Sequence, residues 1–210
     1  NVTDALRAEF KKSNGAVTTP ASIVNQVIEC TIPETILRNL STEDILKLKI
    51  ADIACGSGAF LVGVFDHLVK EFERRIARGE EITPGHVVQI DDRYVLTVEG
   101  KRAIINNCLY GVDINPEAVE VAKMSLSLKI IDSYMPSDFG AVGILGSQIL
   151  KDVGTNIKCG NSLVGNDVLT LYPSLANDIE QLQDTNAFDW YAAFPNVFEN
   201  GGFDYVVGNP

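Results

Sequence analysis

Apolar residues recur along much of the chain at helical spacing, and the clearest example begins just after Gly58. There the apolar positions return every three or four residues, as they do on the buried face of a helix. The positions are Phe60, Leu61, Val64, Phe65, Leu68, Val69 and Phe72. Charged residues from Glu71 to Arg78, and then Gly79, predict the end of this helix.

Short continuous apolar runs, each followed by turn-forming residues, predict strands. They are residues 50–54, 108–114, 156–159 and 203–207. A helix that opens at an Asn-Pro-Glu sequence, where Pro suits the first turn, follows the second run. Strands that alternate with helices pair in parallel, so the pattern predicts an α/β domain with a mainly parallel sheet over residues 49–210.

Residues 1–48 predict a short helical segment ahead of this domain. The Thr-Thr-Pro sequence at 18–20 predicts a helix start, with a Thr cap and Pro in the first turn. Two more helical stretches are predicted at residues 33–40 and 42–48.

Two other regions carry weaker signals. Residues 87–90 and 94–98 flank a polar Asp-Asp-Arg turn and predict a β-hairpin, which residues 104–107 close. Residues 166–202 contain scattered aromatic side chains without a clear period, and we predict a long irregular stretch there.

Composition places the chain among ordinary globular proteins. It has 210 residues, 46% of them apolar, enough for one domain that buries roughly 70% of its unfolded surface. No window approaches about 18 uncharged apolar residues, so we expect no membrane span and a cytoplasmic location. The chain begins at Asn1 rather than Met and stops at Pro210 inside a motif, so we expect a fragment of a larger protein.

The formal net charge of −11 weighs against nucleic-acid binding, because 28 Asp and Glu outnumber 17 Lys and Arg. A nucleic-acid-binding surface usually carries a basic footprint. Either the protein does not bind nucleic acid, or its main binding surface lies outside this chain.

The cysteines form no metal-binding pattern. They are Cys30, Cys55, Cys108 and Cys159. The sequence has no Cys-x-x-Cys pair, and its only histidines are His67 and His86, so we expect no metal site. Three of the 4 cysteines lie in or beside apolar strand-like segments, which predicts small buried thiols in a reducing cytoplasm.

The first candidate site follows the strand predicted at 50–54. Gly56 and Gly58 let the backbone approach a ligand closely, and the start of the next helix favours negative charge. The dinucleotide-binding fingerprint would need a third glycine where Leu61 stands, and a glycine pair alone is as often a simple turn. Asp52 makes the pattern more specific, since its carboxylate repels phosphate and suits a cationic or hydroxyl-bearing ligand such as S-adenosylmethionine.

Three further strand ends carry polar residues. Asp113 can accept hydrogen bonds from both hydroxyls of a ribose, or instead cap the helix that begins near Pro116. Asn161 can bond the edge of an adenine ring, or serve only as a turn residue. Asn209-Pro210 offers two oxygen acceptors that can hold an amino group by both hydrogens, although Asn-Pro is also a common turn signal. Ligands bind beyond the carboxyl ends of strands in such sheets, so we expect a single site.

These motifs resemble those of the S-adenosylmethionine-dependent DNA methyltransferases that modify the N6 atom of adenine. Residues 52–61, Asp-Ile-Ala-Cys-Gly-Ser-Gly-Ala-Phe-Leu, are similar to their first motif, and residues 110–119 resemble the second. Residues 208–210 resemble the start of their catalytic Asn-Pro-Pro-aromatic motif. Residues 15–20 resemble the Thr-Pro segment that closes over the methionine part of the cofactor, and their place matches the γ-type motif order.

Segments 188–198 and 202–204 are similar to large single-chain restriction–modification enzymes and related phage-defence methyltransferases. The resemblance implies a Rossmann-like class I methyltransferase fold, S-adenosyl-L-methionine as cofactor, and double-stranded DNA as a partner bound mainly through regions outside this chain. It implies catalysis by Asn209 and Pro210. The residues implied to bind the cofactor are Thr19, Asp52, Ala54, Cys55, Gly56, Gly58, Asp113, Ile114, Asn161 and Ser162.

The sequence departs from the family pattern in two places. Asn161 stands where Asp is common, and its amide keeps an oxygen acceptor for the adenine amino group. The second Pro and the aromatic residue of the catalytic motif would follow Pro210. We therefore expect this chain to bind cofactor without methylating DNA efficiently.

Two other functions fit the motifs. Related enzymes methylate glutamine amides in proteins or amino groups in ribosomal RNA, and the acidic charge favours a protein substrate. A cofactor-sensing or assembly module without catalysis is the second alternative.

Overall fold

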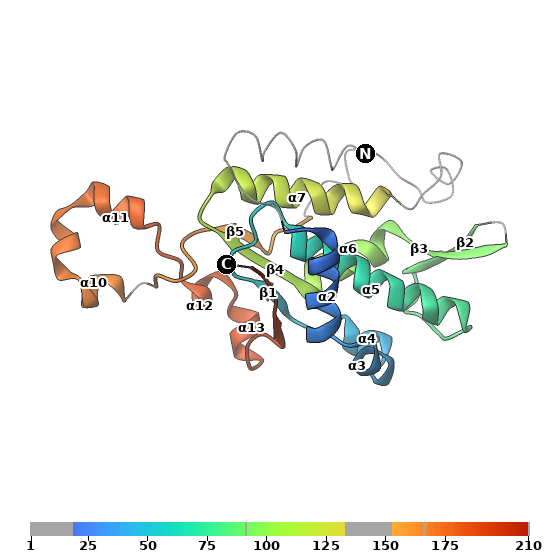
Figure 1. Ribbon diagram of the computed structural model, residues 1–210. Helices are drawn as coiled ribbons and strands as arrows, with labels where there is room; N and C mark the ends of the chain where they lie inside the picture. Colours follow the sequence, from blue (N-terminus) through green and yellow to red (C-terminus); the bar gives the residue numbers. More distant parts are fainter. Residues whose placement is uncertain (1–18, 91, 133–152, 166, 210) are drawn as a thin grey trace.

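The structure is a computed structural model that describes residues 19–90, 92–132, 153–165 and 167–209. Within these residues the centre is a four-stranded parallel sheet in the order β5-β4-β1-β6. The strands are β1 Ile50–Asp52, β4 Leu109–Asp113, β5 Ile157–Cys159 and β6 Tyr205–Val206. Figure 1 shows this sheet at the centre of the molecule. The predicted α/β fold with a mainly parallel sheet is confirmed.

Helices and a separate hairpin surround the sheet. Their bounds are α2 Ala21–Thr31, α3 Glu34–Asn39, α4 Thr42–Ile45, α5 Ala59–Ala77, β2 Val87–Ile90, β3 Arg93–Leu96, α6 Val98–Cys108, α7 Pro116–Ile131, α10 Val168–Leu171, the 3₁₀ helix η2 Pro173–Asn177, α11 Ile179–Thr185, α12 Trp190–Ala193 and α13 Pro195–Glu199.

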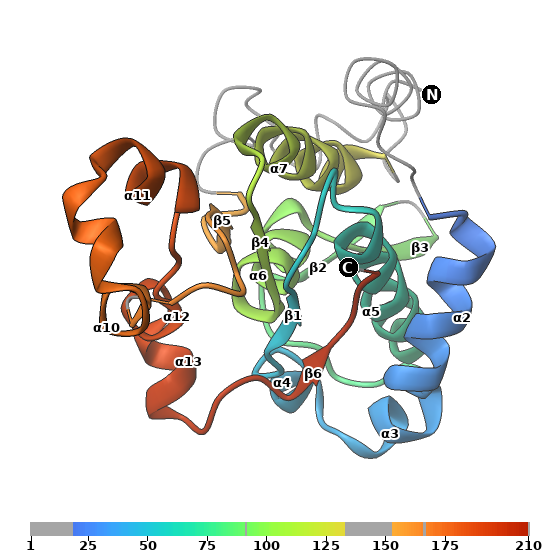
Figure 2. The same ribbon diagram turned by 60° about the vertical axis from the view of Figure 1, so that its left-hand side comes forward.

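Successive side chains of a strand point to opposite faces of the sheet, and both faces are buried here. Leu109 of β4 joins the larger core, to which α5, α6 and α7 contribute. Its neighbours Tyr110 and Val112 pack with Phe188 and Phe194 in a second, smaller core. Figure 2 shows α12 and α13 on the side of the sheet away from α5. The result is a three-layer arrangement in which β1 and β4 are central.

The N-terminal helix α2 packs closely along α5. Gly63 of α5 permits this contact, since a Cβ atom there would lie 2.6 Å from Cδ1 of Ile28 and 2.8 Å from Cγ1 of Val24. Both of these α2 side chains are buried. The close approach fixes α2 on the helix that follows the glycine turn.

Two predicted details of the N-terminal helices are wrong. Pro20 occupies the N-cap of α2 without a side-chain cap hydrogen bond, so Thr19 does not cap the helix. The other candidate cap, Thr18, lies outside the described residues. Helix α4 ends at Ile45 rather than near residue 48, because the chain turns directly after it, at Leu46.

The predicted hairpin is confirmed as the antiparallel pair β2–β3, but the element after it differs from the prediction. Oγ1 of Thr97 accepts a hydrogen bond from the Gly100 backbone N–H at 3.1 Å, which caps the first turn of α6. Strand β3 therefore ends at Leu96, and residues 104–107 lie inside a helix instead of closing an insert.

The stretch 166–202 was predicted to be irregular, and that prediction is wrong for most of it. The described residues form α10, η2, α11, α12 and α13. Asp178 and Asp189 cap α11 and α12 by accepting hydrogen bonds from backbone N–H groups. No helix here exceeds 7 residues, so a helical period of apolar positions has no room to develop.

Cys55 and Cys108 are buried, whereas Cys30 and Cys159 are exposed. The prediction of a buried thiol is wrong for Cys159, because β5 lies at the edge of the sheet. Burial raises the pKa of the Cys108 thiol to about 12. Among the described residues, no three His, Cys, Asp or Glu side chains are grouped to hold a metal ion. No helix in that part of the chain is long and apolar enough to cross a membrane.

Candidate active site

The order of the strands creates a switch point beside β1. The chain passes from β1 to β4 and β5 on one side, and then returns to pair β6 on the other side of β1. In open α/β sheets, ligands bind in the crevice beyond the carboxyl ends of the strands at such a point. Apart from Thr19 and Pro210, the predicted site residues lie at or just after the carboxyl ends of β1, β4, β5 and β6, so the structure gathers them along one edge of the sheet.

The glycine turn connects β1 to the N-terminus of α5. Gly58 N–H donates to the Cys55 carbonyl oxygen at 2.8 Å, which closes the turn. Gly58 adopts the left-handed conformation, with φ of 83°, and a Cβ atom there would lie 3.0 Å from Cβ of Ala122 in α7. Only glycine combines this conformation with so close an approach. The turn therefore leaves the first backbone N–H groups of α5 facing the site.

Asp113 holds the tip of β4 against this turn. Its Oδ2 atom accepts a hydrogen bond from Gly56 N–H at 2.7 Å, and its Oδ1 atom accepts one from Asn115 N–H at 2.9 Å. Asn115, not Asp113, is the N-cap of α7, so the capping alternative for Asp113 is wrong. A carboxylate oxygen has further lone pairs. Asp113 therefore keeps acceptor capacity for a ligand.

Asp52 is a buried carboxyl group at the tip of β1, with 1% of its surface exposed. Its Oδ1 atom accepts a hydrogen bond from Ala54 N–H at 3.2 Å. Burial raises the pKa of Asp52 from 3.8 to about 7, and the negative charge of Asp113 adds to the rise. A cation at this edge would reverse that effect by favouring the ionised form.

Gly208 brings β6 into contact with Asp52. Its φ of 154° suits glycine, and a Cβ atom there would lie 2.8 Å from Oδ1 of Asp52. The close contact with the Asp52 carboxyl group therefore requires glycine at position 208, ahead of the predicted catalytic residues, and the sequence pattern did not predict this contact.

Asn209 meets the N-terminal segment. Its Nδ2 atom donates a hydrogen bond to Oγ1 of Thr19 at 3.3 Å. An amide that donates through nitrogen keeps its oxygen as an acceptor. The structure thus joins two predicted site residues that lie 190 positions apart. Pro210, the other predicted catalytic residue, lies outside the described residues, as do positions 15–18 of the Thr-Pro segment.

The loop after β5 carries Asn161 and Ser162. Oδ1 of Asn161 accepts a hydrogen bond from Leu163 N–H at 3.2 Å, so Asn161 does form the local turn of its alternative interpretation. The Ser162 carbonyl oxygen accepts a hydrogen bond from Nε1 of Trp190 at 3.0 Å. Trp190 was noted in the sequence only as part of a family resemblance, and a side chain 28 residues away gives no local signal of such a contact.

The three other residues predicted to bind the cofactor differ in their exposure. Ile114 exposes 53% of its surface at the tip of β4, and Ala54 is partly exposed. The Cys55 side chain is buried beneath the turn, so its backbone is the part that can meet a ligand. Burial, together with the charge of Asp52, raises the pKa of the Cys55 thiol, which keeps it neutral.

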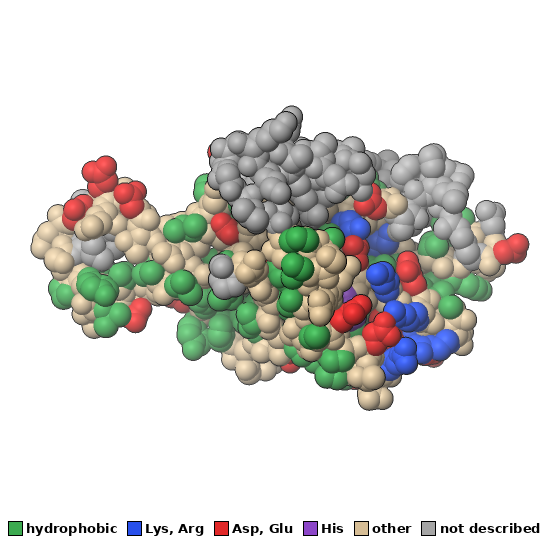
Figure 3. All heavy atoms as spheres, in the orientation of Figure 1, with side chains coloured by type: hydrophobic (Ala, Val, Ile, Leu, Met, Phe, Trp, Pro, Cys, Tyr) green, Lys and Arg blue, Asp and Glu red, His purple; other side chains and the backbone are tan. Residues whose placement is uncertain are grey.

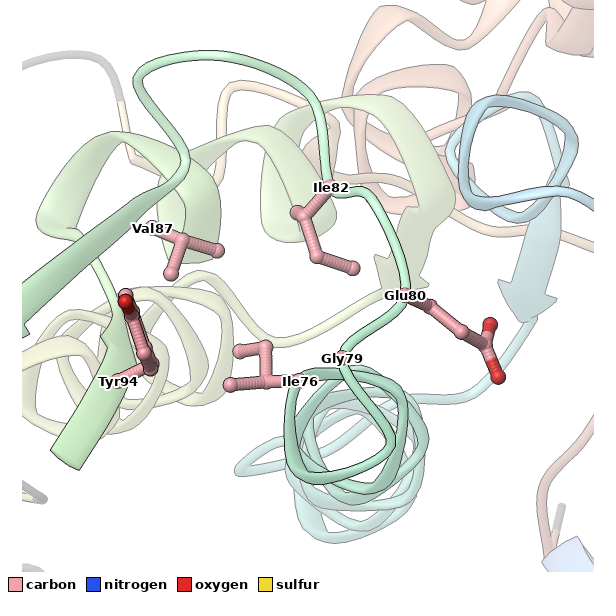
Figure 4. A pocket seen from close by; sticks show the side chains of 6 residues that line it. All are labelled: Ile76, Gly79, Glu80, Ile82, Val87 and Tyr94. Carbon is pink, nitrogen blue, oxygen red and sulfur yellow. The ribbon is translucent and has the colours of Figure 1, made fainter.

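A pocket of about 300 Å³ lies at the opposite end of α5 from the glycine turn. Figure 4 shows its lining of Ile76, Gly79, Glu80, Ile82, Val87 and Tyr94. None of the predicted site residues lines it. This pocket and the strand-tip site are therefore separate features of the molecule.

Basic side chains do not form an unopposed patch on the face drawn in Figure 3, where Lys and Arg lie among Asp and Glu. Arg78 and Glu80 form an ion pair at 2.9 Å, and Arg38 pairs with Glu34 at 3.0 Å. Glu34 also pairs with Arg74. Exposed pairs of this kind leave little net positive charge to attract a phosphate backbone.

A parallel α/β sheet with a switch point, a glycine turn that opens a helix, and carboxylates at two adjacent strand tips define the Rossmann-like class of cofactor-binding domains. The family model described as N-6 DNA Methylase matches residues 4–140, and the model described as Eco57I restriction-modification methylase matches residues 107–210. The chain belongs to the N-6 DNA methylases of the restriction–modification type.

Two sequence relatives and one solved structure are among the proteins to which this chain is similar. The type II restriction enzyme and methyltransferase RM.Eco57I of Escherichia coli is 31% identical over 204 residues, which cover 92% of this chain and 17% of that protein. The adenine-specific methyltransferase PglX of Streptomyces coelicolor is 26% identical over 98% of this chain and 15% of its own length. The solved type IIL restriction-modification enzyme MmeI, in complex with DNA, is 15% identical with a TM-score of 0.36, over 94% of this chain and 25% of that one. The chain thus spans 17% or less of the two sequence relatives.

Proposed function

We propose that this chain is the cofactor-binding and catalytic core of an enzyme that transfers a methyl group from S-adenosyl-L-methionine to the N6 atom of adenine in DNA. The parent protein would serve restriction–modification or phage defence. The observation that carries the proposal is a pair of contacts at the switch point. Gly208 packs against the Asp52 carboxyl group, and Asn209 is hydrogen-bonded to Thr19. We also propose that residues 1–48 form a helical segment that carries Thr19, and residues 49–210 the methyltransferase domain.

The residues present fit the proposed cofactor. Asp52 is a carboxyl group whose pKa is raised by burial and by the charge of Asp113, and the amino and sulfonium groups of S-adenosylmethionine are cationic. Asp113 has acceptor capacity for the ribose hydroxyls, and Asn161 and Ser162 lie at the neighbouring strand tip for the adenine. The backbone of Ala54, Cys55, Gly56 and Gly58 would surround the ligand, with Ile114 as an apolar contact.

Asn209 would position the target amino group. Its side-chain oxygen and the Pro210 carbonyl would accept the two N6 hydrogens of an adenine rotated out of the duplex. These bonds draw the nitrogen lone pair out of conjugation with the ring and aim it at the site. The bound cofactor supplies an electrophilic methyl group. Positioning and electrostatics then suffice, without a strong general base.

Thr19 gives this role a physical basis. Because Oγ1 of Thr19 takes up the amide nitrogen of Asn209, the amide oxygen is left to face the substrate. Double-stranded DNA is the proposed partner, and the net charge of −11 implies that regions outside residues 1–210 make most of the contacts with it.

A protein amide is the second candidate substrate, because the acidic chain would not repel a basic or neutral polypeptide. Both substrates present a planar amino group to the same pair of acceptors. They therefore use the same residues and differ only in the macromolecule that delivers the group.

The test is labelled-methyl transfer by the full-length protein to unmethylated duplex DNA. The Asn209→Ala variant should lose transfer but keep cofactor binding in calorimetry. The Asp113→Ala variant should weaken binding by roughly 10–100-fold, because it removes charge-assisted hydrogen bonds. Label recovered in protein instead of DNA would favour the second candidate. Unchanged binding in Asp113→Ala would contradict the proposed ribose contact.

A further inference from the structure

The chain segment 186–190 returns to the loop that follows β5 and forms three hydrogen bonds with residues 161–164 of that loop. Asn161 N–H donates to the Asn186 carbonyl oxygen at 2.6 Å, and Phe188 N–H donates to the Val164 carbonyl oxygen at 2.8 Å. Between these two bonds, the indole N–H of Trp190 donates to the Ser162 carbonyl oxygen at 3.0 Å. We call residues 186–190 the anchor segment.

Close packing fixes the anchor segment at the strand tip. A Cβ atom on Gly160 would lie 2.6 Å from Cδ2 of Phe188, so the ring lies directly on the backbone of the strand end. Phe188 and Trp190 meet edge to face with ring centroids 5.1 Å apart. The ring centroid of Trp190 also lies 5.8 Å from that of Phe194 and 5.7 Å from that of Phe203. Aromatic contacts from three directions therefore hold the indole in place.

The loop itself has few other ties. Val164 N–H donates to the Asn161 carbonyl oxygen at 3.1 Å and Leu163 N–H donates to Oδ1 of Asn161 at 3.2 Å, and both bonds lie within the turn. Leu163 leaves 82% of its surface exposed, so it does not anchor the loop by packing. The orientation of the peptide group at Ser162 is thus set mainly from outside the loop.

We propose that Trp190 is a positioning residue for the adenine end of the cofactor, an inference that rests on the proposed function. Its N–H holds the Ser162 carbonyl toward the aromatic cluster. This peptide group adjoins Asn161, whose Oδ1 atom accepts a hydrogen bond from Leu163 N–H at 3.2 Å and keeps a further lone pair for a ligand. The bond from Trp190 thus fixes the acceptors and donors that read the 6-amino group of the purine.

The variant Trp190→Phe tests this role, because it keeps an aromatic ring in the cluster and removes the N–H donor together with one ring of the indole. The ligands are S-adenosylhomocysteine and its inosine counterpart, which replaces the 6-amino group with an oxygen. We expect the variant to bind S-adenosylhomocysteine about 3–10-fold more weakly, the loss of one hydrogen bond. The preference for the adenine ligand over the inosine ligand should fall by a similar factor.

Phe198→Leu is the matched control, since Phe198 contacts Phe203 in the same aromatic cluster but makes no hydrogen bond to the loop. It should keep the wild-type preference between the two ligands. Trp190 is the only tryptophan of the chain, so wild-type emission should change when S-adenosylhomocysteine binds.

The outcomes separate the two proposals. If Trp190→Phe binds both ligands as the wild type does, or loses affinity for both equally, the positioning role is overturned while the proposed function stands. If calorimetry detects no binding of S-adenosylhomocysteine to the wild-type protein, the proposed function itself fails. A reduced preference in Trp190→Phe alone supports the inference.

Discussion

At the scale of single residues, Asp52 is the most informative group in the molecule. It is a buried carboxyl group bonded to Ala54 N–H and contacted by Gly208, and burial raises its pKa to about 7. The folded protein therefore binds a proton here that the unfolded chain, with its pKa of 3.8, releases. The stability that protonated Asp52 gives to the folded state is therefore lost as the pH rises from 3.8 to about 7. Above that range the buried carboxylate is ionised, and it destabilises the folded state by its full amount.

Asp52→Asn should consequently stabilise the ligand-free protein at about pH 8 by roughly 1–3 kcal/mol, measured by urea denaturation, and change little near pH 4. The same change should weaken S-adenosylmethionine binding, because the ionised carboxylate attracts the cationic ligand. The affinity ratio of wild type to variant should grow from about pH 6 to about pH 8. Because the ligand titrates identically with both proteins, a ratio that is constant with pH would exclude the electrostatic role.

The residues that sequence reasoning placed well are those whose neighbours are local. Asp52, Gly56 and Gly58 belong to one strand–turn–helix unit, and Asp113 repeats that position on the next strand. Trp190 could not be found in this way, because its bond to Ser162 depends on how a long connection folds back. The same holds for Gly208, whose glycine is explained by a side chain far along the sequence.

At the scale of elements, a buried ion pair links α5 to the N-terminal helices. Arg75 is 3% exposed and bonds Glu71 at 2.9 Å, and Glu71 is fully buried. The guanidinium group also donates to the carbonyl oxygens of Leu37 and Leu40, at 2.7 and 2.8 Å. These carbonyls end α3, so Arg75 fixes α3 on the helix that begins at the glycine turn.

Arg75→Met should destabilise the protein by about 3 kcal/mol, because it removes the buried partner of two carbonyl groups and leaves Glu71 only its longer pairs with Arg74 at 3.5 Å and Arg78 at 3.4 Å. Arg38→Met is the matched control, since Arg38 is exposed and its pair with Glu34 should contribute less than about 1 kcal/mol. Denaturant midpoints of both variants provide the measurement. Equal, small losses in the two variants would mean that Arg74 and Arg78, which also pair with Glu71, compensate for the loss of Arg75.

The elements that could be predicted are those long enough to show a period or bounded by clear turn residues. Helix α5 is long enough to show its period, and the hairpin β2–β3 has its turn residues in the sequence. Helices α11 and α12 each begin at an Asp cap, whereas α10 and α13 have no side-chain cap, and all four are too short for a repeating apolar face. Helix α6 was missed because its cap, Thr97, also suits a strand.

At the scale of the whole molecule, charge is divided unevenly along the chain. From residue 159 to residue 210 the sequence contains no Lys or Arg, although Asp and Glu recur throughout this part. The segment from Cys159 to the strand tip at Asn209 is therefore acidic, and a phosphate backbone near it would be repelled.

This chain alone should bind cofactor but not duplex DNA. S-adenosylhomocysteine at about 100 times its Kd should add about 2.7 kcal/mol of stability and raise the Tm by roughly 5–10 °C. Fluorescence anisotropy with a labelled duplex of about 20 base pairs should show no binding at physiological salt. Tight, salt-sensitive binding of the duplex would contradict this division of roles.

The helices α10, η2 and α11 form an arm that stands away from the sheet in both views. The chain leaves the sheet at Asn161 and comes back beside it at Asn186, where the two backbones are hydrogen-bonded. The register of β6 is set independently, because the backbone N–H groups of Asp204 and Val207 donate to the carbonyl oxygens of Lys49, which precedes β1, and Ala51, which lies within it. The arm can therefore change length, be exchanged between lineages or receive a grafted domain without moving the Asn209 amide.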